Sequence, residues 1–179
     1  MLLRSPYGSL YSVNVPPSNG QPAGVILTNL IPLPERLFMG GSESMRGFSI
    51  NQAGPRDPTT GFPIGGNGLF FNSFELRTSF AQKRFGLVLF QDSGNVYSSV
   101  RYMRLFKFHQ SSPADFDYTS HAVGLGLRYK TPVGPIRFDV GYNLNPPRYN
   151  VSPTTNGVTT TEVQRLSNVQ FFLSIGQSF

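Results

Sequence analysis

Few side chains in this sequence of 179 residues could carry out chemistry, and the most informative of them is Arg46. It stands in Met45-Arg46-Gly47-Phe48, inside a stretch rich in Gly and Pro that covers residues 40–68. A lone arginine in such a stretch predicts a loop tip that docks against another part of the protein. Arginine suits carboxylate partners because its planar guanidinium donates parallel hydrogen bonds and stays charged. The candidate partners are Glu75 and Asp92.

The remaining ionisable residues form no pattern typical of an enzyme. There are nine carboxylates, two histidines and no cysteine. His109 and His121 lack the spacing of a metal-binding motif, and neither a nucleophile elbow nor a phosphate-binding loop occurs. Asp115 and Asp117 are typical of carboxylates in a solvated loop. We therefore predict a protein that is not an enzyme and uses neither a metal nor another cofactor.

The elements that would position these side chains are β-strands, because apolar and polar residues alternate with period two. The alternation is clearest in five segments, residues 69–80, 85–92, 123–130, 136–143 and 169–179. Glu75 would share a face with Ser73 and Arg77, and Asp92 would share a face with Phe90. The short turn at residues 81–84 would bring these two polar faces together.

The second face of the strands separates a membrane barrel from a soluble sandwich. A soluble sandwich covers its outer face with Lys, Glu and Asp, but charged residues are only 13% of this chain. One face here is glycine, serine and scattered charge, and the other is continuously apolar, with aromatic residues near the strand ends at Phe80, Phe85, Tyr129 and Phe179. This favours an all-β fold, the antiparallel wall of a transmembrane β-barrel with a polar lumen.

The connections alternate between short and long, as in outer-membrane barrels with short periplasmic turns and long external loops. Residues 81–84 and 131–134 are short, whereas 98–119 and 145–167 are long. We predict a single region, 1–179, with uncertain early strands in 1–31, an external loop at 39–68 that folds into the lumen, and five strands in 69–179. Six or seven strands in all cannot close a barrel that needs at least eight, so part of a larger barrel is expected.

The net charge of +6 permits two interpretations. Basic chains can neutralise nucleic-acid phosphates, and basic and aromatic residues interleave in the segment 101–109. The same segment could instead be a strand end and loop that face anionic lipid headgroups. We favour the lipid interpretation and predict no nucleic-acid partner.

Strand parity alone leaves the partner of the two inward carboxylates open. Arg46 could reach Glu75 and Asp92 if its loop folds inward. Alternatively, the carboxylates could pair with arginines on the luminal face of the strands, namely Arg77, Arg128 or Arg137.

Several further stretches are informative when they are taken together, namely residues 38–48, 66–68 with 74–76, 90–94, 131–139 and 171–179. Together they resemble the C-terminal barrel region of the Omp85 superfamily, the bacterial surface antigen family of outer-membrane assembly and translocation factors. The resemblance implies that Arg46, Gly47 and Phe48 form a loop latch inside the barrel. It implies luminal partners at Glu75, Phe90, Asp92 and Gly94. It also implies a terminal signal for the assembly machinery, formed by Phe171, Leu173, Ile175, Gly176 and Phe179.

The family barrel has sixteen strands and is preceded by periplasmic POTRA modules, and a client strand is thought to pair at the seam between its first and last strands. The expected function is therefore that of the C-terminal barrel part of an assembly or translocation factor in the bacterial outer membrane, with residues 168–179 as the last seam strand. The implied partners are outer-membrane lipids, the assembly machinery, nascent outer-membrane proteins, and the N-terminal strands and POTRA modules that this sequence lacks. The alternatives are a passive structural or pore-forming barrel and a two-partner secretion transporter.

Overall fold

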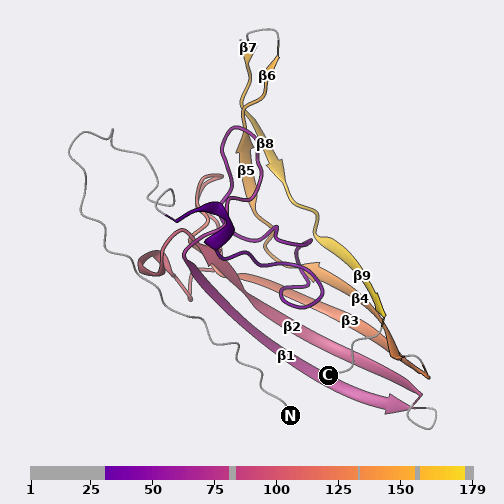
Figure 1. Ribbon diagram of the computed structural model, residues 1–179. Helices are drawn as coiled ribbons and strands as arrows, with labels where there is room; N and C mark the ends of the chain where they lie inside the picture. The colour runs from indigo at the N-terminus through magenta and orange to yellow at the C-terminus, as the bar shows by residue number, and fades with distance from the viewer. Residues whose placement is uncertain (1–30, 81–83, 133, 156–157, 176–179) are drawn as a thin grey trace.

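The computed structural model describes residues 31–80, 84–132, 134–155 and 158–175 (Figure 1). The early strands expected before residue 31 lie outside the described residues, as do Gly176 and Phe179 of the terminal segment. Among the described residues, no helix has the length and apolarity needed to cross a bilayer. The helical elements there are two short 3-10 turns, η2 (Leu33–Glu35) and η3 (Val100–Tyr102).

The main element is an antiparallel sheet of five strands in the order β1-β2-β3-β4-β9. Its strands are β1 (Gly68–Phe80), β2 (Phe85–Tyr97), β3 (Ser120–Thr131), β4 (Gly134–Asn143) and β9 (Val169–Ile175). Long strands run side by side and curve as one sheet, and loop 39–68 lies against it (Figure 1). The expected all-β antiparallel architecture is confirmed, and the described strands form an open sheet with β1 and β9 at its edges.

The two faces of the sheet differ as the alternation predicts. One face is exposed and apolar along every strand, and its most exposed side chains include Leu76, Leu89, Leu125, Phe171 and Leu173. The other face carries buried polar groups, including Asp92, Asp139 and Asn143. This distribution is that of a membrane-barrel wall, in which lipid replaces a protein core on the outer side.

Aromatic rings form a row at the end of the sheet where the connections are short. The rings of Phe80 and Phe85 stack with centroids 5.7 Å apart, and the ring of Tyr129 lies 4.8 Å from that of Phe85. Aromatic side chains gather in this way at the interface between the hydrocarbon and the headgroups. The row therefore marks one edge of the lipid-facing band.

The connection at residues 145–167, which the sequence gives only as long, contains hairpin structure. Two short strands, β5 (Arg148–Val151) and β8 (Glu162–Arg165), pair antiparallel. At the tip, β6 (Thr154–Thr155) pairs with β7 (Val158–Thr159). This extension projects from the end of the sheet opposite the short turns (Figure 1). The strands are too short to show an apolar alternation, which explains why the sequence did not predict them.

Loop 39–68 packs on the polar face of the sheet through a small apolar cluster. Its members come from the loop and from two strands, and they are Met39, Met45, Phe48, Ala53, Val96 and Ala122. Leu69, Phe71 and Leu166 pack against this cluster. The burial of these side chains holds the loop against the polar face of the sheet.

Candidate functional site

The site is built around Arg46, whose side chain is only 3% exposed. Its guanidinium meets the carboxylate of Asp92 with two parallel bonds, from Nε to Oδ2 and from Nη2 to Oδ1, each 2.8 Å long. The backbone N–H of Arg46 also donates to Oδ2 of Asp92, at 3.1 Å. Asp92 lies in β2 and is fully buried. This bidentate, buried geometry is the strongest form of an arginine–carboxylate contact.

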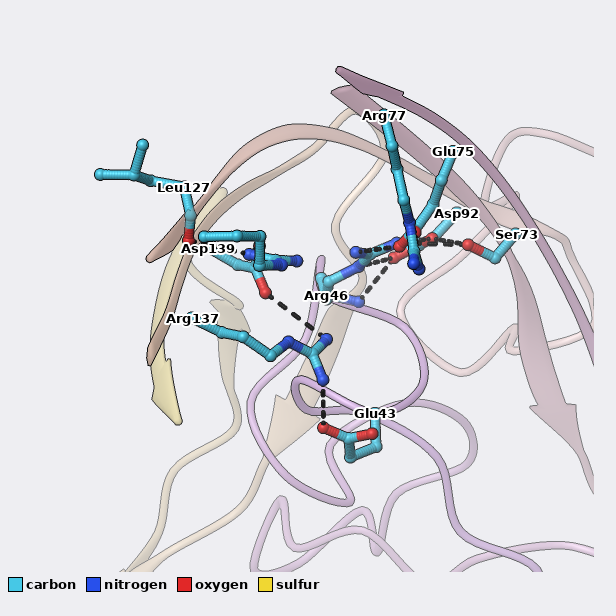
Figure 2. Close-up of polar contacts among 10 residues, drawn as sticks. Glu43, Arg46, Ser73, Glu75, Arg77, Asp92, Leu127, Arg137 and Asp139 are labelled. Atoms are coloured by element: carbon cyan, nitrogen blue, oxygen red, sulfur yellow. Dashed lines mark hydrogen bonds and ion pairs between the residues drawn. The ribbon is translucent and has the colours of Figure 1, made fainter. Parts of the chain in front are cut away.

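The neighbouring strand β1 completes the binding of the guanidinium (Figure 2). Nη1 of Arg46 donates to Oε1 of Glu75 at 2.6 Å, and Nη2 donates to Oγ of Ser73 at 3.2 Å. The hydroxyl of Ser73 in turn donates to Oδ1 of Asp92 at 2.6 Å. Glu75 also accepts a hydrogen bond from Nε of Arg77, at 2.7 Å. Glu75 therefore binds both Arg46 and Arg77, two of the arginines that the sequence offers as its partners.

The aromatic ring of Phe90 packs against the guanidinium of Arg46. The Cζ atom of Arg46 lies 3.6 Å from the centroid of the Phe90 ring, which places the cation over the aromatic face. The ring has room because the facing residue in β3 is Gly124, where an added Cβ would come within 2.2 Å of Phe90 Cζ. The luminal glycines seen in the sequence thus make space for a bulky neighbour.

Gly47 and Phe48 fix the rest of the loop tip. The carbonyl of Gly47 accepts a hydrogen bond from Nδ2 of Asn143 in β4, at 3.2 Å. A Cβ at Gly47 would lie 2.6 Å from that of Ala122 in β3, so only glycine permits this close approach. Phe48 is buried in the apolar cluster. The tip therefore contacts four successive strands of the sheet.

Gly94, the last predicted luminal partner, makes no contact with Arg46 in the described contacts. It lies in β2 opposite Phe71 of β1, where an added Cβ would come within 2.2 Å of the Phe70 carbonyl oxygen. Its position indicates a backbone role, because it allows β1 and β2 to approach closely beside the site.

The two other luminal arginines form a separate network on β3 and β4 (Figure 2). Nη1 of Arg128 donates to Oδ1 of Asp139, and Nη1 of Arg137 donates to Oε1 of Glu43 at 3.1 Å. Arg128 and Arg137 therefore bind Asp139 and Glu43, and not Glu75 or Asp92. The alternative in which Arg128 or Arg137 pairs with Glu75 or Asp92 is wrong.

A second fastening of loop 39–68 involves Arg56, which the sequence did not single out. Arg56 is 6% exposed and donates to the carbonyl of Gly61 at 2.7 Å and to that of Gln52 at 2.8 Å. Its Cζ lies 4.5 Å from the ring centroid of Tyr149 in β5. Burial lowers the pKa of Arg56 below its usual value, and the side chain remains a cation at neutral pH.

The turn next to Arg56 is stabilised by Asp57 and contacts the β5–β8 hairpin. Backbone N–H groups of Thr60 and Thr59 donate to the Asp57 carboxylate and hold its pKa below the usual value. The backbone N–H of Ser152 donates to the Thr59 carbonyl at 3.0 Å. Loop 39–68 thus has two attachments, one to the sheet and one to the β5–β8 hairpin.

The described part of the predicted terminal signal lies in β9. Phe171, Leu173 and Ile175 point to the outer face and are 67–68% exposed. On the luminal face, Gln170 accepts a hydrogen bond from the Ser49 hydroxyl at 2.6 Å, which joins loop 39–68 to this strand. Pairing of β9 with β4 covers residues 136–142 of β4.

These contacts can hold a loop in place. Among the described residues, no three His, Cys, Asp or Glu side chains gather where they could hold a metal ion. Sequence reasoning missed Asn143, the Ser49–Gln170 contact and the Arg56–Tyr149 contact. Each joins residues far apart in the chain, and a single sequence offers no signal for such pairs.

Comparison with known proteins identifies the family of this arrangement. A family model described as the Omp85 superfamily domain matches residues 12–179. The outer membrane protein assembly factor BamA of Nitratidesulfovibrio vulgaris is 32% identical over 119 residues, which are 64% of this chain and 13% of that protein. A SAM50-like protein of Schizosaccharomyces pombe is 32% identical over 120 residues, which are 64% of this chain and 23% of that protein. The chain spans less than a quarter of either relative, and it belongs to the Omp85 superfamily.

Proposed function

We propose that this chain is the C-terminal barrel part of an Omp85-type assembly or translocation factor in a bacterial outer membrane. Arg46 and Asp92 act as the latch that holds loop 39–68 in the lumen, and β9 acts as the last strand of the seam. The partners would be nascent outer-membrane proteins, the assembly machinery and the surrounding lipid. The relatedness to BamA and to a SAM50-like protein supports this role.

The main support for the latch is that the buried carboxylate of Asp92 is bound by a loop that is distant in the sequence. Asp92 accepts from the backbone and from two side-chain nitrogens of Arg46, which lies 46 residues earlier in the chain. Undocking of the loop would break all three bonds at once and separate the Asp92 carboxylate from its cation, which is costly for a buried charge pair. The docked position of the loop is therefore strongly favoured over an undocked one.

The seam role rests on the position of β9 at an edge of the sheet. Among the described residues, β9 is hydrogen-bonded on one side only, to β4. An edge strand presents unpaired N–H and C=O groups to any strand of complementary register. A client strand could pair there by β-augmentation.

The experiment that tests the proposal replaces Arg46 by Ala in the complete protein in its own membrane. We expect loop 39–68 to become sensitive to an externally added protease, and the amount of newly assembled outer-membrane protein to fall. Arg77→Ala is the matched control, because Arg77 also binds Glu75 but is 59% exposed. This control should change neither measurement appreciably, since exposed ion pairs contribute little.

These two measurements, together with the secretion of any dedicated partner protein, separate the proposal from its alternatives. An unchanged protease sensitivity in R46A would contradict the latch. A loop that opens while client assembly continues at the normal rate would contradict the assembly role and favour a passive barrel. Loss of secretion of one dedicated partner, with general assembly intact, would favour a two-partner secretion transporter.

A further inference from the structure

The loop between β2 and β3 presents a group of apolar and basic side chains that the latch and the seam do not use. This aromatic–basic ridge consists of Arg101, Tyr102, Arg104, Leu105, Phe106 and Phe108. The Phe106 side chain is 89% exposed, and Tyr102, Phe108 and Leu105 are 48%, 43% and 38% exposed. So many large apolar groups in one exposed segment indicate an interaction surface.

Hydrogen bonds from Thr119 and Asn145 hold the backbone of the ridge in place. The backbone N–H of Thr119 donates to the Lys107 carbonyl at 2.7 Å, and the Thr119 hydroxyl contacts the Leu105 carbonyl at 3.1 Å. Nδ2 of Asn145 donates to the Phe108 carbonyl at 2.8 Å. These bonds hold the backbone of the ridge, while its large apolar side chains stay exposed.

The ridge continues the lipid-facing face of the sheet. The ring centroid of Phe108 lies 5.0 Å from that of His121, which shares the outer face of β3 with Val123 and Leu125. His121 pairs with Ser93, eight residues along β2 from Phe85 in the aromatic row at the opposite end. Eight residues of a tilted strand rise by roughly 20 Å, which approaches the height of the apolar band of a membrane barrel. The ridge therefore begins where the second membrane interface is expected.

The charges of the ridge match an anionic surface. Lys107 is paired with Asp115, so it belongs to the internal structure of the loop. Arg101 and Arg104 are exposed and take part in none of the ion pairs found among the described residues. Asp117 lies within electrostatic range of Arg104 but is itself partly buried. Two exposed guanidinium groups beside exposed rings can bind lipid phosphates while the rings enter the interface.

We propose that the aromatic–basic ridge is a lipid-binding surface, in which Arg101 and Arg104 bind the phosphates of anionic membrane lipids while Leu105, Phe106 and Phe108 enter the interface. Its continuity with the outer face of β3 favours a lipid surface over another macromolecule. The ridge would fix the depth of the external end of the wall in the membrane. This role is independent of the latch and of any assembly activity.

A tryptophan reporter tests the proposal, because these 179 residues contain no tryptophan. In the complete protein, any tryptophan elsewhere is first replaced by phenylalanine, and Phe106→Trp is then introduced. The control is Phe62→Trp, since Phe62 is also exposed, at 70%, but follows the turn that packs on the external hairpin. Both proteins are inserted into vesicles of phosphatidylcholine, with or without phosphatidylglycerol, whose acyl chains are brominated.

We expect the emission of F106W to shift to the blue and to be quenched several-fold more than that of F62W. Phosphatidylglycerol should increase the quenching, and the double substitution Arg101→Gln with Arg104→Gln should remove this increase. Equal quenching of F106W and F62W would overturn the proposal. A quenching of F106W that is independent of phosphatidylglycerol would also overturn it, because the arginines would then bind no headgroup.

Discussion

At the scale of single residues, Asp92 has a charge that is balanced only while loop 39–68 stays docked. Its two oxygens accept hydrogen bonds from Arg46 and from Ser73 in a fully buried position. A buried ion pair of this kind contributes little net stability relative to apolar residues, but loss of one member leaves an uncompensated charge. The pair therefore specifies one loop position more than it adds to overall stability.

A double-mutant cycle tests this view of the pair. We expect Arg46→Ala and Asp92→Ala each to lower the free energy of unfolding by about 3–5 kcal/mol. The double variant should cost less than the sum of the two by about 0.5–3 kcal/mol, because it leaves no Arg46–Asp92 partner unpaired. Denaturant unfolding of the protein in lipid vesicles measures all three. Additive losses would mean that the two side chains act independently.

Tyr149 offers a residue-scale test of the second attachment. Tyr149→Leu removes the ring beside Arg56, a contact of about 0.5–2 kcal/mol. Protease cleavage should increase near residues 56–61, whereas residues 40–48 should stay protected because Arg46 still binds Asp92. Tyr149→Phe keeps the ring and loses only the hydroxyl contact to Gln164, so it serves as the control. Equal cleavage of Y149L and Y149F would show that the ring does not hold the turn.

The sequence predicts part of this site because strand alternation is local information. Glu75 and Asp92 fall on one face by parity, and the register places Ser73 directly opposite Asp92. Parity could not choose Arg46 over Arg77, Arg128 or Arg137, since the path of a glycine-rich loop depends on tertiary contacts. The family resemblance supplied that choice, and the structure places Arg46 on both carboxylates.

At the scale of elements, luminal glycines determine how closely the loop approaches the strands. A Cβ at Gly141 of β4 would lie 2.0 Å from the carbonyl oxygen of Arg46, which is backbone and cannot move aside alone. At Gly86 of β2, also on the luminal face, the nearest atom would be 3.4 Å away. The same residue type therefore has a different importance at the two positions.

Substitution at these two glycines gives a matched prediction. Gly141→Ala should displace the loop tip and lower the free energy of unfolding by about 1–3 kcal/mol, the usual effect of overpacking. Gly86→Ala should change it by about 0.5 kcal/mol or less. Denaturant unfolding and protease sensitivity of loop 39–68 provide the measurements. Similar losses for G141A and G86A would indicate a general effect of alanine in these strands.

The elements themselves were predictable to different degrees. The five long strands were predictable because each exposes one apolar face over many residues. The β5–β8 hairpin was not, since its strands of four residues carry few apolar side chains and a Thr-rich tip. Contacts with the turn at Asp57 stabilise this hairpin, and such tertiary effects override local pattern.

At the scale of the whole molecule, the protection of backbone amides from hydrogen exchange should depend on the position of each strand in the sheet. Strand β3 is hydrogen-bonded on both sides, whereas β9 pairs with β4 alone among the described strands. In the complete protein, we expect amides of β3 to exchange with deuterium much more slowly than those of β9, because edge strands open with smaller free energies. Hydrogen exchange with mass spectrometry measures this. Equal protection would mean that another strand pairs tightly with β9.

The contacts of loop 39–68 are distributed unevenly across the sheet. We expect this distribution to set the order in which the strands separate from one another. On β2 the loop is held by a buried ion pair, whereas on the described part of β9 it is held by an exposed hydrogen bond between Ser49 and Gln170. The β1–β2 pairing covers 13 residues, and the described part of the β4–β9 pairing covers seven. We therefore expect a sideways force on the wall to detach β9 first. The loop and the four preceding strands would then remain together.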